Sequence, residues 1–182
     1  MNWKNTANHY GSASIAIHWL MLLLFIGVYG SIELRELFEK GSDPREMLKS
    51  WHFMLGILLF AFVLPRIVAR LSGPTPAIAP EPEKMQQLAA KLLHLALYVL
   101  MVAMPISGYL LLSASGKPIP FFGLELPALI APDRELAKQI KEVHEFGGTA
   151  GYFLIGAHFV AALYHHLIVR DNTLTRMLPA KK

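Results

Sequence analysis

Four long apolar stretches constrain this chain more than any other feature of its sequence. They predict helices at about residues 11–32, 50–71, 92–116 and 140–169. At about 1.5 Å per residue, such helices cross the roughly 30 Å of hydrocarbon in a bilayer, and Arg66 and Arg70 can reach the headgroups from the end of the second. With 54% hydrophobic and 16% charged residues, the chain is more apolar than a typical soluble domain. We therefore predict an all-α integral membrane protein, a four-helix bundle forming one domain over residues 1–182.

The charged residues lie mostly at the ends of the apolar stretches. Nine Lys and Arg residues fall on the side of the two termini and eight on the other, whereas Asp and Glu divide three against ten. An even number of spans puts both termini on one side, and we predict that this side is cytoplasmic, in a bacterial inner membrane. The basic residues form no cluster, which argues against nucleic acid as a partner. The first apolar stretch lacks a clear cleavage site and is expected to stay as a membrane anchor.

Cysteine is absent, which excludes disulfides, iron–sulfur clusters and a thiolate ligand to haem. Eight histidines are present, and ionisable side chains inside a membrane are costly unless they have a role. His144 and His158 are 14 residues apart in the fourth predicted helix. At about 100° per residue, the directions of their side chains differ by only about 40°. At about 1.5 Å per residue, they lie about 21 Å apart along the helix axis.

These two depths predict two histidine pairs, one in each leaflet. His18 in the first helix is expected at the level of His158 on the cytoplasmic side, and His52 in the second at the level of His144. Two facing imidazoles in an apolar bundle suit axial ligation of haem iron. The sequence therefore favours a protein that binds two haems.

Glycines follow two of these histidines by one helical turn. Gly56 follows His52, and Gly148 follows His144. Without a side chain they would let a flat macrocycle approach the backbone, although glycines in membrane helices also serve as packing contacts. The sequence alone does not separate these two interpretations.

Three basic residues are candidates for contacts to anions. Arg66 lies 14 residues after His52, so it faces the same direction near the other leaflet, where it could pair with a haem propionate. Lys49 and Lys141 each precede a predicted ligand by three residues and could bind propionates or draw an anion toward the site. All three could also be ordinary interfacial anchors.

Further histidines lie on the cytoplasmic side. His165 is seven residues after His158, on the same face of the helix, and could donate hydrogen bonds and protons to a quinone. His94 lies at a similar depth and competes with His18 as the ligand. His166 is about 80° away from the ligand direction and is expected to meet lipid headgroups.

The chain resembles the bacterial cytochrome b561 family over nearly its whole length. The resemblance rests on residues 14–20, His52 with Gly56, residues 73–76, His94, His144 with Glu145, and residues 151–158, 162–166 and 171–179. It implies two haem b groups, held by His18 with His158 at the cytoplasmic end and by His52 with His144 at the periplasmic end. It also implies that His94 is not a ligand, which leaves His94 and His165 for ubiquinone.

The resemblance further implies oxidation of superoxide at the periplasmic face and reduction of ubiquinone near the cytoplasmic haem, with no obligate protein partner. Glu81 and Glu83 depart from the family pattern, which has lysines in this proline-rich loop. One alternative is an anchor and electron-transfer subunit for a dehydrogenase or hydrogenase. An alternative of another class is a transporter that uses the histidines as stepping stones for metal ions or protons.

Overall fold

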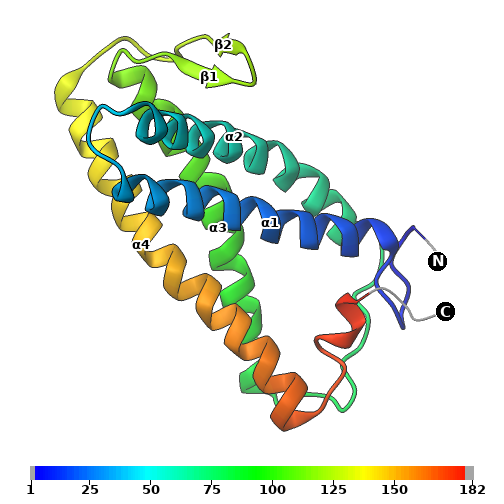
Figure 1. The fold of residues 1–182 in the computed structure, drawn as a ribbon. Helices are drawn as coiled ribbons and strands as arrows, with labels where there is room; N and C mark the ends of the chain where they lie inside the picture. The colour runs from blue at the N-terminus through cyan, green and yellow to red at the C-terminus, as the bar shows by residue number, and fades with distance from the viewer. Residues whose placement is uncertain (1–2, 179–182) are drawn as a thin grey trace. The chain divides into compact units, whose positions relative to one another are not determined.

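The computed structural model describes residues 3–178, and four long helices account for most of them (Figure 1). These helices are α1 (Ser12–Leu34), α2 (Asp43–Leu71), α3 (Lys84–Ala114) and α4 (Arg134–Tyr164). The shorter elements are the 3-10 turns η1 (Arg35–Leu37) and η3 (Thr175–Met177), the π-helical turn η2 (His165–Val169), and the strands β1 (Ile119–Phe121) and β2 (Leu124–Leu126). The all-α prediction is confirmed for the four long elements.

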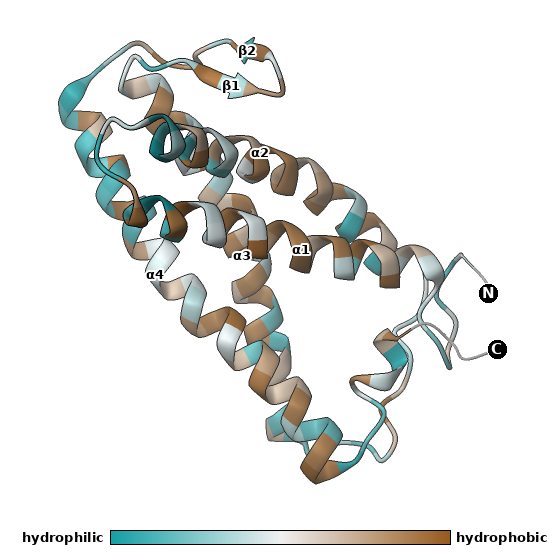
Figure 2. Ribbon diagram, viewed as in Figure 1, coloured by the Kyte–Doolittle hydropathy of each residue, from teal (hydrophilic) through white to brown (hydrophobic). Residues whose placement is uncertain are grey.

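The four helices are long and apolar enough to cross a membrane, as predicted. The candidate spans are Ser12–Leu37, Asp43–Leu71, Lys84–Ala114 and Arg134–Val169, and Figure 2 shows hydrophobic residues dominating the middle of α1. Large apolar side chains lie exposed on them, including Leu23 at 64%, Phe153 at 74% and Val160 at 62%. In water such surfaces would be a liability, whereas in a bilayer they face the acyl chains.

Three helices begin earlier than the sequence analysis predicted. α2 starts at Asp43 rather than 50, α3 at Lys84 rather than 92, and α4 at Arg134 rather than 140. The added turns are polar, so hydropathy detects only the membrane-buried part of each helix. The side chain of Asp133 caps α4 by accepting hydrogen bonds from the backbone N–H groups of Glu135 and Leu136.

A short antiparallel hairpin, which the sequence analysis missed, lies between α3 and α4. β1 and β2 pair with Ile119 opposite Leu126, and Phe122 and Gly123 form the turn. Both turn residues have positive φ, 47° and 87° respectively, as the tightest hairpin turns require. The strands are too short to have shown a clear alternating pattern in the sequence.

The chain divides into two compact units, and every long helix contributes to both. Of the described residues, unit 1 contains 3–19, 63–100 and 150–178. Its polar segments are tied together by side chains, of which Asn5 is the most connected: it donates to the Ala69 carbonyl and accepts from Gly11 N–H and the Ser14 hydroxyl. The tail is tied to α1 separately, because the indole N–H of Trp19 donates to the Met177 carbonyl at 2.8 Å.

Unit 2 contains residues 20–62 and 101–149. Arg45, only 7% exposed, holds the turn between α1 and α2. Its guanidinium donates to the carbonyls of Arg35 and Phe38 and to both carboxylate oxygens of Glu36. The hairpin belongs to this unit as well, because Phe122 packs edge-on against Trp51 at 6.1 Å between ring centroids.

Candidate functional site

Each unit contains one of the predicted histidine pairs. In unit 1, His18 of α1 lies 6.2 Å from His158 of α4, measured between ring centroids. In unit 2, His52 of α2 lies 6.2 Å from His144 of α4. We call these the unit-1 pair and the unit-2 pair.

The ring separation suits one metal ion between the two imidazoles of each pair. A metal–nitrogen bond is about 2 Å, and a five-membered ring with bonds of about 1.3 Å has a radius of about 1.1 Å. Two such ligands on opposite sides of an ion therefore place their centroids about 6.2 Å apart, the value of both pairs. Among residues 3–178, no group of three or more His, Asp or Glu side chains could hold a metal ion. A site with two protein ligands suits a metal that brings its other ligands in a macrocycle, as haem iron does.

Hydrogen bonds in unit 2 fix the ring nitrogen that each histidine presents. His52 Nδ1 lies 2.9 Å from the Val28 carbonyl, which can only accept, so Nδ1 carries the hydrogen. The Ser107 hydroxyl donates to the Met104 carbonyl and therefore accepts from His144 Nδ1, also at 2.9 Å. Both Nε2 atoms are left with free lone pairs. This is the arrangement of ligand histidines in metal proteins, whose other N–H is held by an acceptor.

The unit-1 pair differs at His18. Its Nδ1 lies 2.9 Å from a guanidinium nitrogen of Arg66, which can only donate. Nδ1 of His18 is therefore the acceptor, and the hydrogen is on Nε2. Ligation through Nε2 fits the ring spacing but requires Arg66 to leave this nitrogen, and a propionate is a suitable new partner for it.

His94 of α3 lies close to the unit-1 pair. Its ring centroid is 5.5 Å from that of His158. This separation is shorter than the roughly 6.2 Å that an ion between two imidazoles requires. The geometry favours His18 over His94 as the partner of His158, and ligation by either stays a prediction.

The two glycines near the candidate ligands differ: Gly56 fits the interpretation as room for a flat macrocycle, and Gly148 fits the interpretation as a packing contact. A Cβ added at Gly56 would meet no heavy atom within 4 Å, as expected of a surface on which a flat group could lie. Gly148 instead faces Met104, and its carbonyl accepts a hydrogen bond from the Tyr29 hydroxyl. Gly108 was not singled out in the sequence, yet an added Cβ there would lie 3.1 Å from the imidazole of His144.

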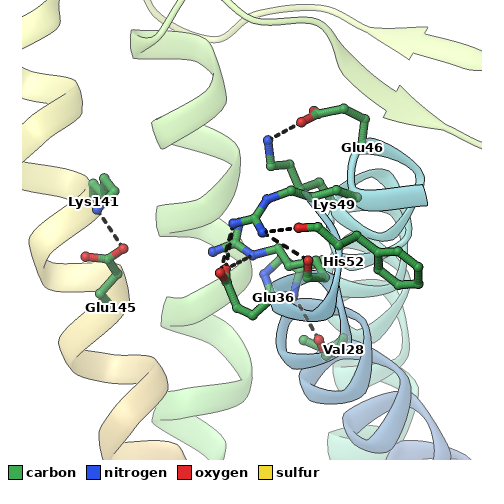
Figure 3. A network of polar contacts seen from close by, with 10 residues as sticks. Val28, Glu36, Glu46, Lys49, His52, Lys141 and Glu145 are labelled. Carbon is green, nitrogen blue, oxygen red and sulfur yellow. Dashed lines mark hydrogen bonds and ion pairs between the residues drawn. The ribbon is translucent and has the colours of Figure 1, made fainter. Parts of the chain in front are cut away.

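Both candidate lysines of unit 2 are paired with carboxylates. Lys49 pairs with Glu46, and Lys141 pairs with Glu145 at 2.6 Å (Figure 3). The members of each pair lie on one helix, three or four residues apart, and all but the half-buried Lys49 are exposed. Pairing compensates much of the charge that would attract an anion.

His165, the predicted quinone residue, is held by Asp171, which belongs to the family-like tail and to which the sequence analysis assigned no role. Its Nδ1 donates to Asp171, whose side chain is fully buried and also accepts from Thr173 N–H. Although burial alone would raise the pKa of Asp171, the hydrogen bonds from His165 and Thr173 lower it below its usual value. His165 opens the π-helical turn η2, an irregularity frequent at functional sites. His166 is exposed, as expected.

Four membrane-length helices and two histidine pairs spaced for a metal ion define a multi-pass membrane protein with candidate haem centres. Comparison with known proteins supports this class: the family model described as prokaryotic cytochrome b561 matches residues 9–180. The chain belongs to the prokaryotic cytochrome b561 family, and membership implies haem b as its cofactor.

Curated relatives of similar length agree with this assignment. Cytochrome b561 homolog 1 of Escherichia coli (strain K12) is 37% identical over 96% of this chain and 99% of its own length. A probable superoxide oxidase, CybB of Yersinia pestis, is 39% identical over 95% of this chain and 97% of its own. Cytochrome b561 homolog 2 of Escherichia coli (strain K12) is 35% identical over 98% and 95%. The chain is thus a multi-pass cytochrome of the bacterial inner membrane that takes part in electron transport.

Proposed function

We propose that this cytochrome binds two haem b groups, oxidises superoxide at its periplasmic face and reduces ubiquinone near its cytoplasmic haem. The observation that carries the proposal is the repeated histidine geometry, 6.2 Å between ring centroids in both pairs. Both pairs draw one ligand from α4, and these two ligands are 14 residues apart in one continuous helix. The name of the Yersinia pestis relative supports superoxide as the electron donor.

When bound, haem b supplies a one-electron couple at each pair. The histidine pairs would supply ring nitrogens to the iron, and in unit 2 the Val28 carbonyl and the Ser107 hydroxyl fix the orientation of the two rings. Gly56 leaves room beside His52 for a flat group. Apolar side chains of the helices exclude water, which protects a reduced centre from side reactions.

The overall reaction needs protons only on the quinone side. Two superoxide anions each lose one electron to become O₂, and these two electrons with two protons convert one ubiquinone to ubiquinol. His165 is the proposed proton donor, because an imidazole can release a proton from Nε2 while Asp171 holds Nδ1. Asp171 remains a carboxylate throughout and stabilises the protonated ring between transfers.

The direct test uses purified protein reconstituted with haem. We expect two haems per chain by pyridine haemochrome, reduction of the haem spectrum on mixing with superoxide, and formation of ubiquinol when ubiquinone is present. Asp171→Asn should slow ubiquinol formation without changing the rate at which superoxide reduces the haem. If superoxide leaves the haem spectrum oxidised, the proposed donor is wrong.

A second candidate function is electron transfer from a dehydrogenase or hydrogenase partner. It is favoured by the ion pairs of Lys49 and Lys141, which leave little free positive charge to draw superoxide toward unit 2. A weak dependence of the superoxide reaction on ionic strength, together with copurification of a stoichiometric redox partner, would support it over superoxide oxidation.

A further inference from the structure

The two units carry opposite net charge. Among residues 3–178, unit 1 has seven Lys and Arg against three Asp and Glu, a net charge of +4. Unit 2 has eight against ten, a net charge of −2. The two histidine pairs therefore lie in units whose net charges have opposite sign.

The positive charge of unit 1 lies close to its histidines. Arg66 contacts His18 directly, and Arg70 lies one helical turn beyond Arg66 in α2. Arg176 directly precedes Met177, whose carbonyl accepts a hydrogen bond from Trp19, the neighbour of His18 in α1. No ion pair to a carboxylate forms at these three arginines within the described part of the chain. Arg70 donates to the Thr75 hydroxyl, whereas Arg176 donates to a carbonyl and lies over an aromatic ring.

The cations of unit 2 are arranged in the opposite way. Four of them pair with glutamates: Arg35 and Arg45 with Glu36, Lys49 with Glu46, and Lys141 with Glu145. Because Glu36 pairs with two arginines, three carboxylates offset three of these four positive charges. Within residues 3–178, no ion pair to a carboxylate offsets the charge of the three unit-1 arginines.

We propose that the uncompensated charge of Arg66, Arg70 and Arg176 sets the direction of electron flow, by giving a haem at the unit-1 pair a higher reduction potential than one at the unit-2 pair. Adding an electron lowers the charge of a haem by one, so nearby cations favour the reduced form. Two propionates bound by these arginines would still leave one positive charge. The inference rests on the proposed haem pairs but not on the identity of the electron donor.

The test is a redox titration of the purified holoprotein followed by its haem absorbance. We expect two midpoint potentials, and the His144→Ala variant, which keeps only the unit-1 pair, should retain the higher one. At an effective dielectric constant of about 20, one charge at about 10 Å changes the equilibrium constant by about tenfold. Arg70→Gln and Arg176→Gln should each lower the higher potential by about 59 mV, the equivalent of tenfold for one electron.

Charge-preserving variants separate an electrostatic effect from a structural one. Arg70→Lys and Arg176→Lys should keep the potential near its original value, and Lys138→Gln, which removes one charge from unit 2, should leave the higher potential unchanged. A higher potential at the unit-2 pair, or equal shifts in the Gln and Lys variants, would overturn the inference. Two haems with the expected potentials but no reaction with superoxide would instead refute the proposed donor alone.

Discussion

Replacing Ser107 by alanine is expected to weaken haem binding at the unit-2 pair by about 10- to 100-fold. The serine accepts the hydrogen of His144 Nδ1 at 2.9 Å and is itself fixed by donating to the Met104 carbonyl. Without it, a ring N–H inside an apolar bundle loses its acceptor, at a cost of about 1–3 kcal/mol. Since every 1.4 kcal/mol is about tenfold in affinity, the cost agrees with that range.

The assay is a haem titration of the apoprotein in detergent, followed by the haem absorbance and by a pyridine haemochrome count. Ser107→Thr keeps the hydroxyl and should restore affinity. Ser72→Ala is the matched control, because Ser72 makes the same kind of bond to the carbonyl three residues earlier without a histidine. If Ser107→Ala binds both haems as tightly as the original protein, the hydrogen bond from His144 to Ser107 does not contribute to haem binding.

Three further predictions follow from the site and its surroundings. His18→Ala should reduce the haem count from two to one, while His94→Ala should leave it at two; the reverse result in a pyridine haemochrome assay would make His94 the ligand. Gly108→Ala should lower haem occupancy, because the new methyl lies 3.1 Å from the ligand imidazole of unit 2, whereas Gly30→Ala, which meets nothing within 4 Å, should not. Asp171→Asn should lower the temperature of thermal unfolding at neutral pH. The hydrogen bonds that lower the pKa of Asp171 in the folded protein stabilise the fold at any pH above the usual pKa of an aspartate. This stabilisation is lost as the pH falls through the lower pKa of the folded state. The difference between variant and original protein should therefore shrink in acid, and a constant difference would show that its cause is not the charge.

The helices and the ligand candidates were predictable because they depend on periodicity along single segments. Apolar length predicted four spans, and the 14-residue spacing of His144 and His158 predicted one ligand in each unit. The starts of α2, α3 and α4 were placed too late, because their first turns are polar. The β1–β2 hairpin was missed, since its strands have three residues each.

The sequence by itself therefore determined the membrane class and the four membrane-length helices, and it predicted the histidines that we propose to hold haem, because each of these follows from composition and helical geometry. Only the tertiary structure decided what surrounds those residues. The Val28 carbonyl and the Ser107 hydroxyl became visible as hydrogen-bond partners of the candidate ligands His52 and His144 only once separate helices were packed together. The same holds for Asp171 beside His165 and, within residues 3–178, for the unit-1 arginines, which form no ion pair with a carboxylate. Contacts between distant segments decide which ring nitrogen is free and which charge is paired. Residue spacing along one helix does not encode such contacts.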